Sequence, residues 1–447
     1  MHTLEQLRSG ALAGARRLDL SCGLTEVPRE VFDLADTLEI LNLTGNRLST
    51  LPADLGCLRK LKIIFCSSNE FAELPEVLGD CPALEMVGFK ANRISHVSGA
   101  ALPQKLRWLI LTDNAIDSLP QELGQRPAMQ KLMLAGNRLS GLPAGLADAH
   151  ALELLRLSAN RFTELPPWLT RLPRLAWLAL AGNPLGWQHA LAPTLPRLSW
   201  HRLRLMDRLG EGASGQIHRV RLEPDGAAGQ TLALKLFKAS VTSDGLPEHE
   251  IAACAAAGHH PALCTPVAEL AEHPDGTPGL LMPVMPPELH NLAGPPNFQS
   301  CTRDLYPDGF AMEVGVALRL AARMAHALAH LHRRGMMHGD FYAHNILWNP
   351  ASGEAMLSDF GGASLLPDDQ PELRSALQAL DVRAFGCLLE ELAAHARQGD
   401  AAGTALVERM KTLAAACMVF DPAARPDMNE VAKALDVLNP VESATGR

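Results

Sequence analysis

Several residues of this chain have side chains and spacings suited to holding the phosphates of a nucleotide. Gly210, Gly212 and Gly215 fall within one short loop, where the lack of side chains lets backbone amides approach an anion closely. Lys235 follows at the end of the apolar stretch Leu-Ala-Leu-Lys. Because an ammonium group in an apolar strand loses hydration unless an anion pairs with it, we expect Lys235 to contact a phosphate.

Two aspartate motifs follow the lysine. His-Gly-Asp occupies 338–340 and is followed by Asn345, and Asp-Phe-Gly occupies 359–361. With the glycine loop and the lysine, in this order, they resemble the motif set of the protein kinases. Asp-Val-Arg-Ala-Phe-Gly at 381–386 and Asp-Pro-Ala-Ala-Arg-Pro at 421–426 also match that family. The resemblance implies transfer of a phosphoryl group from ATP.

The resemblance covers the chain from about residue 201 to residue 439 and implies a role for each motif. Asp340 would position the acceptor hydroxyl and accept its proton. Lys235 would contact the α and β phosphates and pair with Glu250, or with Glu248, on the following helix. Mg2+, or Mn2+ in its place, would bridge the phosphates. The implied metal ligands are Asn345 and Asp359, and the implied nucleotide-binding residues are Gly210, Gly212, Gly215, Ile217, Ala233, Lys235, Met282 and Met285.

Three departures from the family pattern concern activation and the acceptor. Gly339 stands where many kinases have an arginine that binds an activation-loop phosphate, so we expect activity without loop phosphorylation. Tyr342 and His344 stand where the family usually keeps a lysine or an arginine, and His344 would be a partial substitute for that cation. The stretch from Asp359 to Asp381 is short and contains no complete Ala-Pro-Glu, so the support for a peptide substrate is reduced.

These departures leave alternatives to the main interpretation. We expect an ATP-dependent protein kinase, of the serine/threonine type. Small-molecule phosphotransferases such as the aminoglycoside kinases also use a His-Gly-Asp loop, so a non-peptide acceptor is one alternative. A pseudokinase scaffold that binds nucleotide without turnover is the other. The stretch at 286–307, after the expected hinge near Met282–Met285, is interpreted as a loop insertion without an assigned role.

A leucine pattern recurs through the first part of the chain and resembles the leucine-rich repeat. Alternating leucines such as Leu41 and Leu43 would point inward from a short strand, so stacked strands would form a parallel sheet. The first copy has Gly23 where an asparagine is expected, as a capping repeat would. The asparagines of the other copies, at intervals of 22 or 23 residues, are Asn46, Asn69, Asn92, Asn114, Asn137, Asn160 and Asn183.

The residues between the inward leucines are expected on the concave face of the repeat array. They are mostly apolar, and a continuous exposed apolar stripe usually marks a contact surface. We therefore expect this face to bind a protein partner or substrate. The alternative is that the face packs on the chain's own kinase-like domain or on a second copy. The residues that carry this prediction are Phe65, Met86, Trp108, Met133 and Trp177.

Together the patterns predict two domains of different fold class. Residues 1–200 are expected to form an α/β leucine-rich-repeat solenoid with parallel strands on its concave face, and its end at 187–200 would be a cap and connector. Residues 201–447 are expected to form an α+β bilobal protein-kinase-like domain. Its N-lobe would span about 201–285 and its C-lobe about 286–440.

Composition excludes some functions. The formal net charge of −9, without a basic patch, argues against nucleic-acid binding. No apolar run is long enough to span a bilayer, and the first residues lack the layout of a secretion signal. The nine cysteines show no Cys-x-x-Cys spacing, which suits free thiols in a reducing compartment. We expect a cytoplasmic protein.

Overall fold

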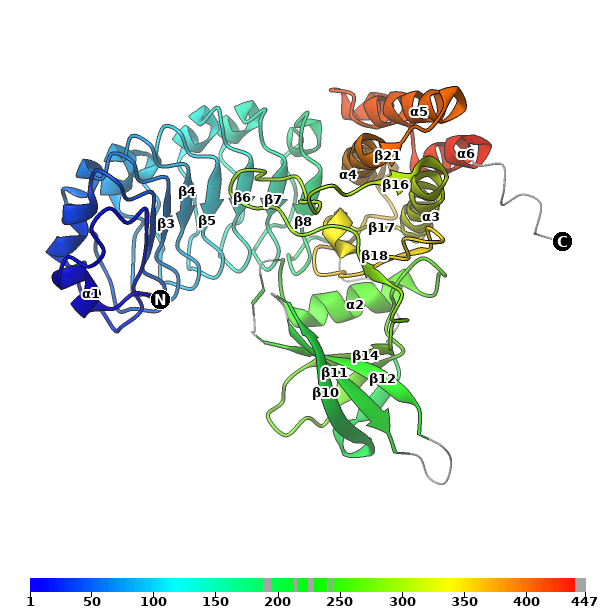
Figure 1. Ribbon diagram of the computed structural model, residues 1–447, viewed down its shortest axis with the longest axis horizontal. Helices are drawn as coiled ribbons and strands as arrows, with labels where there is room; N and C mark the ends of the chain where they lie inside the picture. Colours follow the sequence, from blue (N-terminus) through cyan, green and yellow to red (C-terminus); the bar gives the residue numbers. More distant parts are fainter. Residues whose placement is uncertain (188–193, 213–214, 224–228, 239–240, 243, 439–447) are drawn as a thin grey trace. The chain divides into compact units, whose positions relative to one another are not determined.

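The computed structural model describes residues 1–187, 194–212, 215–223, 229–238, 241–242 and 244–438. The chain divides into two compact units (Figure 1). The first, here called the repeat unit, comprises Met1–Leu175 and Asn183–Leu185. The second, here called the two-lobed unit, comprises Ala176–Gly182 and Gly186–Arg447. A short piece of the last leucine repeat therefore belongs to the two-lobed unit.

Short parallel strands, one from each leucine repeat, form a single sheet in sequence order, which confirms the predicted solenoid. Their inward leucines, such as Leu41 and Leu43, are fully buried. The chain begins with the short helix α1 (Leu4–Arg8). The strands are β1 (Arg17–Asp19), β2 (Ile40–Asn42), β3 (Ile63–Phe65), β4 (Met86–Gly88), β5 (Trp108–Ile110), β6 (Lys131–Met133), β7 (Leu154–Arg156) and β8 (Trp177–Ala179).

The return segments of the repeats contain 3-10 helices. Pro75, Pro120 and Pro143 stand at the N-caps of three of them, where the missing N–H of proline costs no helical hydrogen bond. Each of these prolines follows a leucine, so a Leu-Pro pair begins each of these return segments. The helices are η1 (Arg29–Leu34), η2 (Leu55–Cys57), η3 (Glu76–Asp80), η4 (Gly99–Ala101), η5 (Gln121–Gln125), η6 (Ala144–Asp148) and η7 (Leu169–Arg171).

The repeat asparagines form a ladder of buried hydrogen bonds. The side-chain amide of Asn137 donates to the carbonyl oxygens of Leu134 and Leu111, both at 2.9 Å, and so joins its own turn to the preceding repeat. Its Oδ1 accepts the backbone N–H of Ile116 at 3.0 Å. Asn160 repeats the pattern with Leu157 and Leu134. Each asparagine thus satisfies backbone groups that would otherwise be buried without partners.

The strand-rich lobe of the two-lobed unit is a mixed sheet with the order β10-β11-β12-β14-β13-β9. All neighbours are antiparallel except β9, which runs parallel to β13. Val220, Leu234 and Leu281 form its core, and Trp200 packs against it. The elements are β9 (Arg197–Ser199), β10 (Leu203–Glu211), β11 (Gly215–Leu222), β12 (Thr231–Phe237), α2 (Pro247–Ala257), β13 (Ala268–Ala271) and β14 (Gly279–Pro283).

Strand β9 comes from the stretch that we interpreted as a connector. Residues 194–200 are described and contribute β9 to the sheet of the strand-rich lobe, whereas 188–193 lie outside the described residues. The short 3-10 helix η8 (Trp200–Arg202) then leads into β10. The boundary that we expect between residues 200 and 201 stays a prediction.

The second lobe is mainly helical, as the bilobal expectation requires (Figure 1). Helix α3 buries an apolar stripe that includes Leu320, Met324 and Leu331. Helix α4 begins at Pro371, because proline is well accepted in a first helical turn. The helices are α3 (Val314–Arg333), η9 (Ala343–Asn345), α4 (Pro371–His395), α5 (Ala401–Cys417), η10 (Pro422–Ala424) and α6 (Met428–Leu438).

Three small sheets complete this lobe. They pair β15 (His290–Asn291) with β18 (Ile346–Trp348) and β19 (Ala355–Leu357), β16 (Met312–Glu313) with β21 (Ala396–Arg397), and β17 (Met336–Met337) with β20 (Ser364–Leu365). Within the described ranges, no helix has both the length and the apolar character needed to cross a bilayer.

The asparagine ladder generates a stability prediction. Replacing Asn137 with alanine leaves two buried carbonyls and one buried N–H without their partner, at a cost of about 2–4 kcal/mol. We expect amide hydrogen exchange across 108–139 to accelerate more than tenfold, read by mass spectrometry. The control is Arg138→Ala, an exposed neighbour in the same turn. Equal exchange in the two variants would contradict the ladder.

Candidate active site

The two-lobed unit contains a cavity of about 660 Å³ that gathers the predicted nucleotide and metal residues. One of its walls is made by β10, β11 and β12, which carry Gly210, Gly215 and Lys235. Leu347 and Leu280, which the sequence did not single out, also line it. Asp340 is not among its lining residues. The predicted residues that line it are Gly210, Gly212, Gly215, Ile217, Ala233, Lys235, Glu250, Met282, Met285, Asn345 and Asp359.

The glycine loop is only partly described. Gly210 and Gly212 lie at the end of β10 and just after it, and Gly215 begins β11, whereas residues 213 and 214 lie outside the described residues. The backbone N–H of Gly212 donates to the carbonyl of Gly215 at 2.9 Å, which closes the turn. A Cβ at Gly215 would lie 2.6 Å from the carbonyl oxygen of Leu236, so a side chain is excluded there.

Lys235 and Glu250 form a buried ion pair. The Lys235 Nζ lies 2.5 Å from Glu250 Oε1, and the two residues are 9% and 5% exposed. Glu250 rather than Glu248 is therefore the partner of the lysine. Helix α2 positions Glu250 in its first turn, where a carboxylate is favoured by the helix dipole.

Burial and the surrounding charges shift the pKa values of both residues of the pair. Burial alone would lower the pKa of Lys235, but the carboxylates of Asp359 and Glu250 raise it above its ordinary value. Burial raises the pKa of Glu250 to about 7, assisted by Asp359 and opposed by Lys235. We take the pair as ionised, because the ammonium has two carboxylates around it and a direct 2.5 Å contact with one of them.

The loop that carries Asp340 is braced by a buried carboxylate on α4. Asp381 is fully buried, and its two oxygens accept the backbone N–H groups of His338 and Gly339 at 2.7 and 3.0 Å. The His332 ring nitrogen lies 3.2 Å from the same carboxylate. His338 itself packs with its ring 5.4 Å from that of Phe360, and burial lowers its pKa. The His338 side chain thus has a packing role.

Asn345 and Asp359 present oxygen ligands to the cavity. The Asn345 amide nitrogen donates to Asp340 Oδ2 at 2.9 Å, so its amide oxygen is left without a hydrogen-bond partner among the described residues. Asp359 adopts a left-handed φ of +56°, and its Oδ1 accepts the N–H of Gly361 at 3.1 Å. One carboxylate and one amide oxygen fit Mg2+ when phosphate oxygens and water complete the shell. Among the described residues, no cluster of three His, Cys, Asp or Glu forms a metal site by itself.

The strand of the last leucine repeat lies against the Asp340 loop within the two-lobed unit. The Trp177 Nε1 donates to the carbonyl oxygen of Phe341 at 2.9 Å. The Trp177 ring stacks on Tyr342 with centroids 4.3 Å apart and an interplanar angle of 7°. Further along, the Leu180 N–H donates to Ser364 Oγ at 3.2 Å.

This packing accounts for the glycine that replaces an arginine. Gly339 has a φ of +67°, and a Cβ there would lie 2.4 Å from the carbonyl oxygen of Leu178 and 2.5 Å from that of Gly362. No side chain fits between these two backbones. The unusual residue type is therefore a consequence of the close approach of β8.

The structure corrects the interpretation of Trp177 as a partner-binding residue. Its side chain is 2% exposed and contacts Phe341 and Tyr342, so it matches the alternative in which this part of the face packs within the chain. Met86 is also buried, at 5% exposed. Phe65, Trp108 and Met133 remain partly exposed. Their partner stays a prediction.

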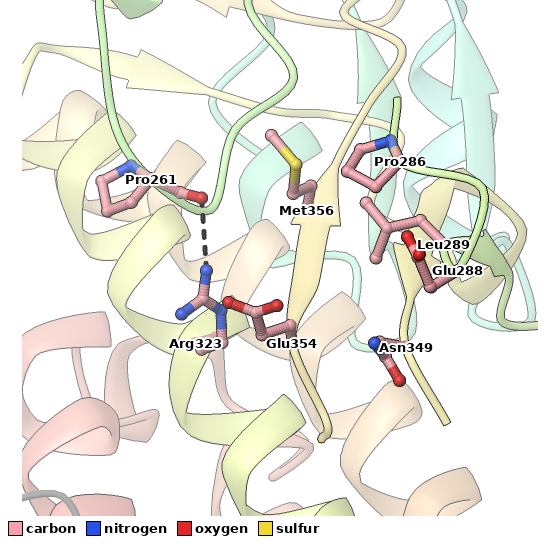
Figure 2. Close-up of a pocket in the computed structure, with 8 residues that line it drawn as sticks. All are labelled: Pro261, Pro286, Glu288, Leu289, Arg323, Asn349, Glu354 and Met356. Atoms are coloured by element: carbon pink, nitrogen blue, oxygen red, sulfur yellow. Dashed lines mark hydrogen bonds between the residues drawn. The ribbon is translucent and has the colours of Figure 1, made fainter. Parts of the chain in front are cut away.

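A second, smaller cavity of about 210 Å³ lies next to the hinge (Figure 2). At one side of it, Arg323 Nη2 donates to the carbonyl oxygen of Pro261 at 3.3 Å. Pro286 and Leu289 line both this cavity and the larger one. None of the predicted site residues lines the smaller cavity, so it adds nothing to the candidate site.

Comparison with known proteins agrees with both units. The model of the protein kinase domain family matches residues 203–395, and leucine rich repeat models match 37–58, 104–162 and 127–185. The chain is 32% identical over 123 residues to probable inactive serine/threonine-protein kinase roco10 of Dictyostelium discoideum. It is 35% identical over 104 residues to probable serine/threonine-protein kinase pats1 of the same organism.

A mouse relative matches a segment of similar size. The chain is 30% identical over 112 residues to leucine-rich repeat and calponin homology domain-containing protein 1 of Mus musculus. The matches to roco10, pats1 and the mouse protein cover 26%, 22% and 24% of this chain, respectively. They cover 5%, 3% and 16% of the relatives, so each relative is much longer than the shared segment.

The buried pair gives a prediction for nucleotide-free protein. Lys235→Met leaves the Glu250 carboxylate buried without its partner and should lower the free energy of unfolding by about 3–5 kcal/mol. The double variant Lys235→Met/Glu250→Leu removes both charges and should regain most of this loss. The measurement is urea denaturation, with the exposed Lys433→Met as control. A double variant as unstable as the single one would contradict a paired arrangement.

The Trp177 contact gives a second prediction. Trp177→Ala removes a fully packed ring and should destabilise the two-lobed unit by about 3–5 kcal/mol, whereas Trp177→Phe, which loses only the hydrogen bond, should cost about 1 kcal/mol. Hydrogen exchange at 338–346 should accelerate more in Trp177→Ala than in Trp177→Phe. The matched control is Trp108→Ala in the repeat unit, which should leave exchange at 338–346 unchanged.

Proposed function

Since this chain has leucine-rich repeats N-terminal to a protein kinase domain, we propose that it transfers the γ-phosphoryl group of ATP to a protein hydroxyl, of the serine/threonine type. The observation that carries the proposal is the convergence of the Lys235–Glu250 pair, Asn345 and Asp359 on one cavity. Four separate segments supply these groups: β12, α2, η9 and the residues just after β19. A volume of about 660 Å³ is sufficient for a nucleotide.

The cavity offers different chemistry at its two ends. Ile217, Ala233, Met282 and Leu347 are apolar and suit the faces of an adenine ring. The glycine strands and Lys235 suit the phosphates, because backbone amides and an ammonium group there can replace the lost hydration. The nucleotide would therefore lie with its base toward the hinge and its phosphates toward Asp359.

Magnesium supplies charge neutralisation on the phosphates when it is bound. Asn345 and Asp359 would hold it through the amide and carboxylate oxygens that they present to the cavity. Glu250 keeps Lys235 in place and prevents it from moving into solvent. These residues orient the γ-phosphoryl group before the acceptor arrives, and such prior orientation lowers the barrier.

Asp340 would position the acceptor hydroxyl and take its proton. Its Oδ2 accepts a hydrogen bond from Asn345 at 2.9 Å, and its backbone carbonyl accepts a second one from the same amide at 3.0 Å. The carboxylate is thus fixed relative to the metal ligands. A general base must first lie within hydrogen-bond distance of the proton that it accepts, and a fixed carboxylate meets this condition.

The repeat unit would supply recognition. Phe65, Trp108 and Met133 are partly exposed on strands β3, β5 and β6 of one sheet, and exposed apolar residues suit a protein-binding surface. We propose that they contact a protein partner or substrate. The partial match to pats1, whose name describes a probable serine/threonine-protein kinase, supports the acceptor class.

The test is transfer of label from radioactive ATP. Asp340→Asn keeps the size and most contacts of the side chain, so we expect Mg-ATP affinity to persist while transfer falls by about 10²–10⁴-fold. Asp359→Asn should weaken both the affinity for Mg-ATP and the transfer of label. Affinity is measured by calorimetry and transfer by label in protein, with the exposed Asp436→Asn as control.

Each other outcome identifies an alternative. Label found only in low-mass compounds would favour a small-molecule phosphotransferase. Wild-type protein that binds Mg-ATP as tightly as Asp340→Asn, with no transfer by either, would favour a pseudokinase scaffold. Binding of no nucleotide at all would contradict the whole proposal.

A further inference from the structure

Helix α3 and its C-cap residue Arg334 present only basic side chains to solvent from Val316 onward. Every residue in this range that is not buried is an arginine or a histidine. Successive intervals of four, three, four and three residues keep those of the helix in one line, which is ~21 Å long at 1.5 Å per residue. These residues, here called the basic stripe, are Arg319, Arg323, His326, His330, Arg333 and Arg334.

Neutral acceptors hold the four arginines of the basic stripe in place. The acceptors use one or two of the five N–H donors of each guanidinium, so the other donors are left for a ligand. Among the described residues, none of these arginines forms an ion pair with a carboxylate. Their positive charges are therefore fixed in position but not neutralised. The bonds run from Arg319 to the carbonyl oxygen of Ser352 at 2.8 Å, from Arg323 to those of Ala355 and Pro261, both at 3.3 Å, from Arg333 to Asn429 Oδ1 at 2.9 Å, and from Arg334 to the carbonyl oxygen of Ala256 at 2.6 Å.

The carboxylates beside the basic stripe do not neutralise it. The His326 Nε2 lies 3.0 Å from Asp436 Oδ1 on the neighbouring helix α6. Glu354 lines the smaller cavity together with Arg323 but forms no ion pair with it (Figure 2). Lys433, three residues before Asp436, is exposed on α6 and adds a further cation. The four arginines and this lysine therefore outnumber the two carboxylates.

The side chain of His260 responds to the excess of positive charge. Its ring centroid lies 4.9 Å from that of His330, and its pKa is lowered to about 4. Burial is the largest cause of this shift, and the basic side chains of α3 lower the pKa further, because a second positive charge beside them is unfavourable. An anion placed on the stripe would gain from the same charges.

The layout of the basic stripe favours an acidic helix over a nucleic acid or a membrane. The stripe is a single line of residues, since the residues on both sides of it along α3 are buried. Carboxylates at intervals of three and four residues on a second helix would repeat along a line at the same spacing of ~5 Å. The net charge of −9 opposes the approach of a large polyanion, whereas direct carboxylate contacts act well within the screening length of about 8 Å. The planar arginine fork also fits a carboxylate through two hydrogen bonds.

We propose that the basic stripe is a docking surface for a helix of a partner protein that carries Asp or Glu at intervals of three and four residues along one face. The arginines would bind these carboxylates with the N–H donors that the protein itself leaves unused. None of the stripe residues lines the 660 Å³ cavity. The inference therefore goes beyond the proposed function and does not depend on it.

Binding of a synthetic peptide tests the charge pattern. The probe is a fluorescein-labelled helical peptide with glutamates at the intervals of the basic stripe. Its control is an isomer of the same composition, in which the glutamates are spread around the helix. We expect the full chain to bind the probe about tenfold more tightly than the isomer at low salt, measured by fluorescence anisotropy. The difference should shrink as salt screens the contacts.

Charge reversal locates the binding surface. Arg319→Glu/Arg333→Glu, at the two ends of the line, should weaken binding of the probe by about tenfold or more. The matched control is Arg47→Glu/Arg409→Glu, which changes the net charge equally at two exposed positions outside the stripe and should keep the wild-type affinity. A second probe, with lysine in place of its outermost glutamates, should bind the Arg319→Glu/Arg333→Glu variant more tightly than it binds the wild type. Such a gain cannot come from a misfolded variant.

Three results would overturn the inference. The first is equal binding of the probe and its isomer, and the second is an equal effect of the stripe variant and its matched control. The third is binding to phosphatidylserine vesicles or to a single-stranded oligonucleotide that is tighter than binding to the probe and is lost in the stripe variant, because the stripe would then serve another polyanion. None of these measurements depends on phosphoryl transfer, so the proposed function stands or fails separately.

Discussion

The geometry of the candidate active site depends on one buried carboxylate. Asp381 has no contact with solvent, and a carboxylate in that position is stable only when donors surround it. The backbone N–H groups of His338 and Gly339 are those donors. Helix α4 can therefore bury Asp381 only when the Asp340 loop lies against it. The loop cannot shift without leaving a charge unsatisfied in the core.

Two further segments, distant in sequence, fix the same loop. Trp177 of β8 holds it through the Phe341 carbonyl and the Tyr342 ring, and Asp304 of the insertion holds it through His344. The segment after Asp359 is short, since α4 begins at Pro371. Segments from three different parts of the chain thus contact the Asp340 loop.

Periodic patterns and short motifs predicted the fold and most of the cavity, because each encodes a local geometric need. The leucine period required a parallel sheet, and Lys235 in an apolar strand required an anion. The alternation of a strand shows which face Trp177 lies on, but not what covers it. Asp304 belongs to no motif, so only the folded chain reveals its partner. Gly339 was the one residue in the sequence that could have indicated the contact with β8, because the backbone of Leu178 lies too close to leave room for a side chain at this position.

The shared eighth strand separates the array into a variable part and a constant part. Modules of 22 or 23 residues could be duplicated or deleted between β1 and β7 without altering any residue that lines the 660 Å³ cavity. The eighth module has no such freedom, because its strand β8 belongs to the two-lobed unit and contacts the Asp340 loop there. Lineages of this architecture should therefore differ in array length at the amino-terminal side. Grafts that give the chain a different repeat array should be joined ahead of residue 176.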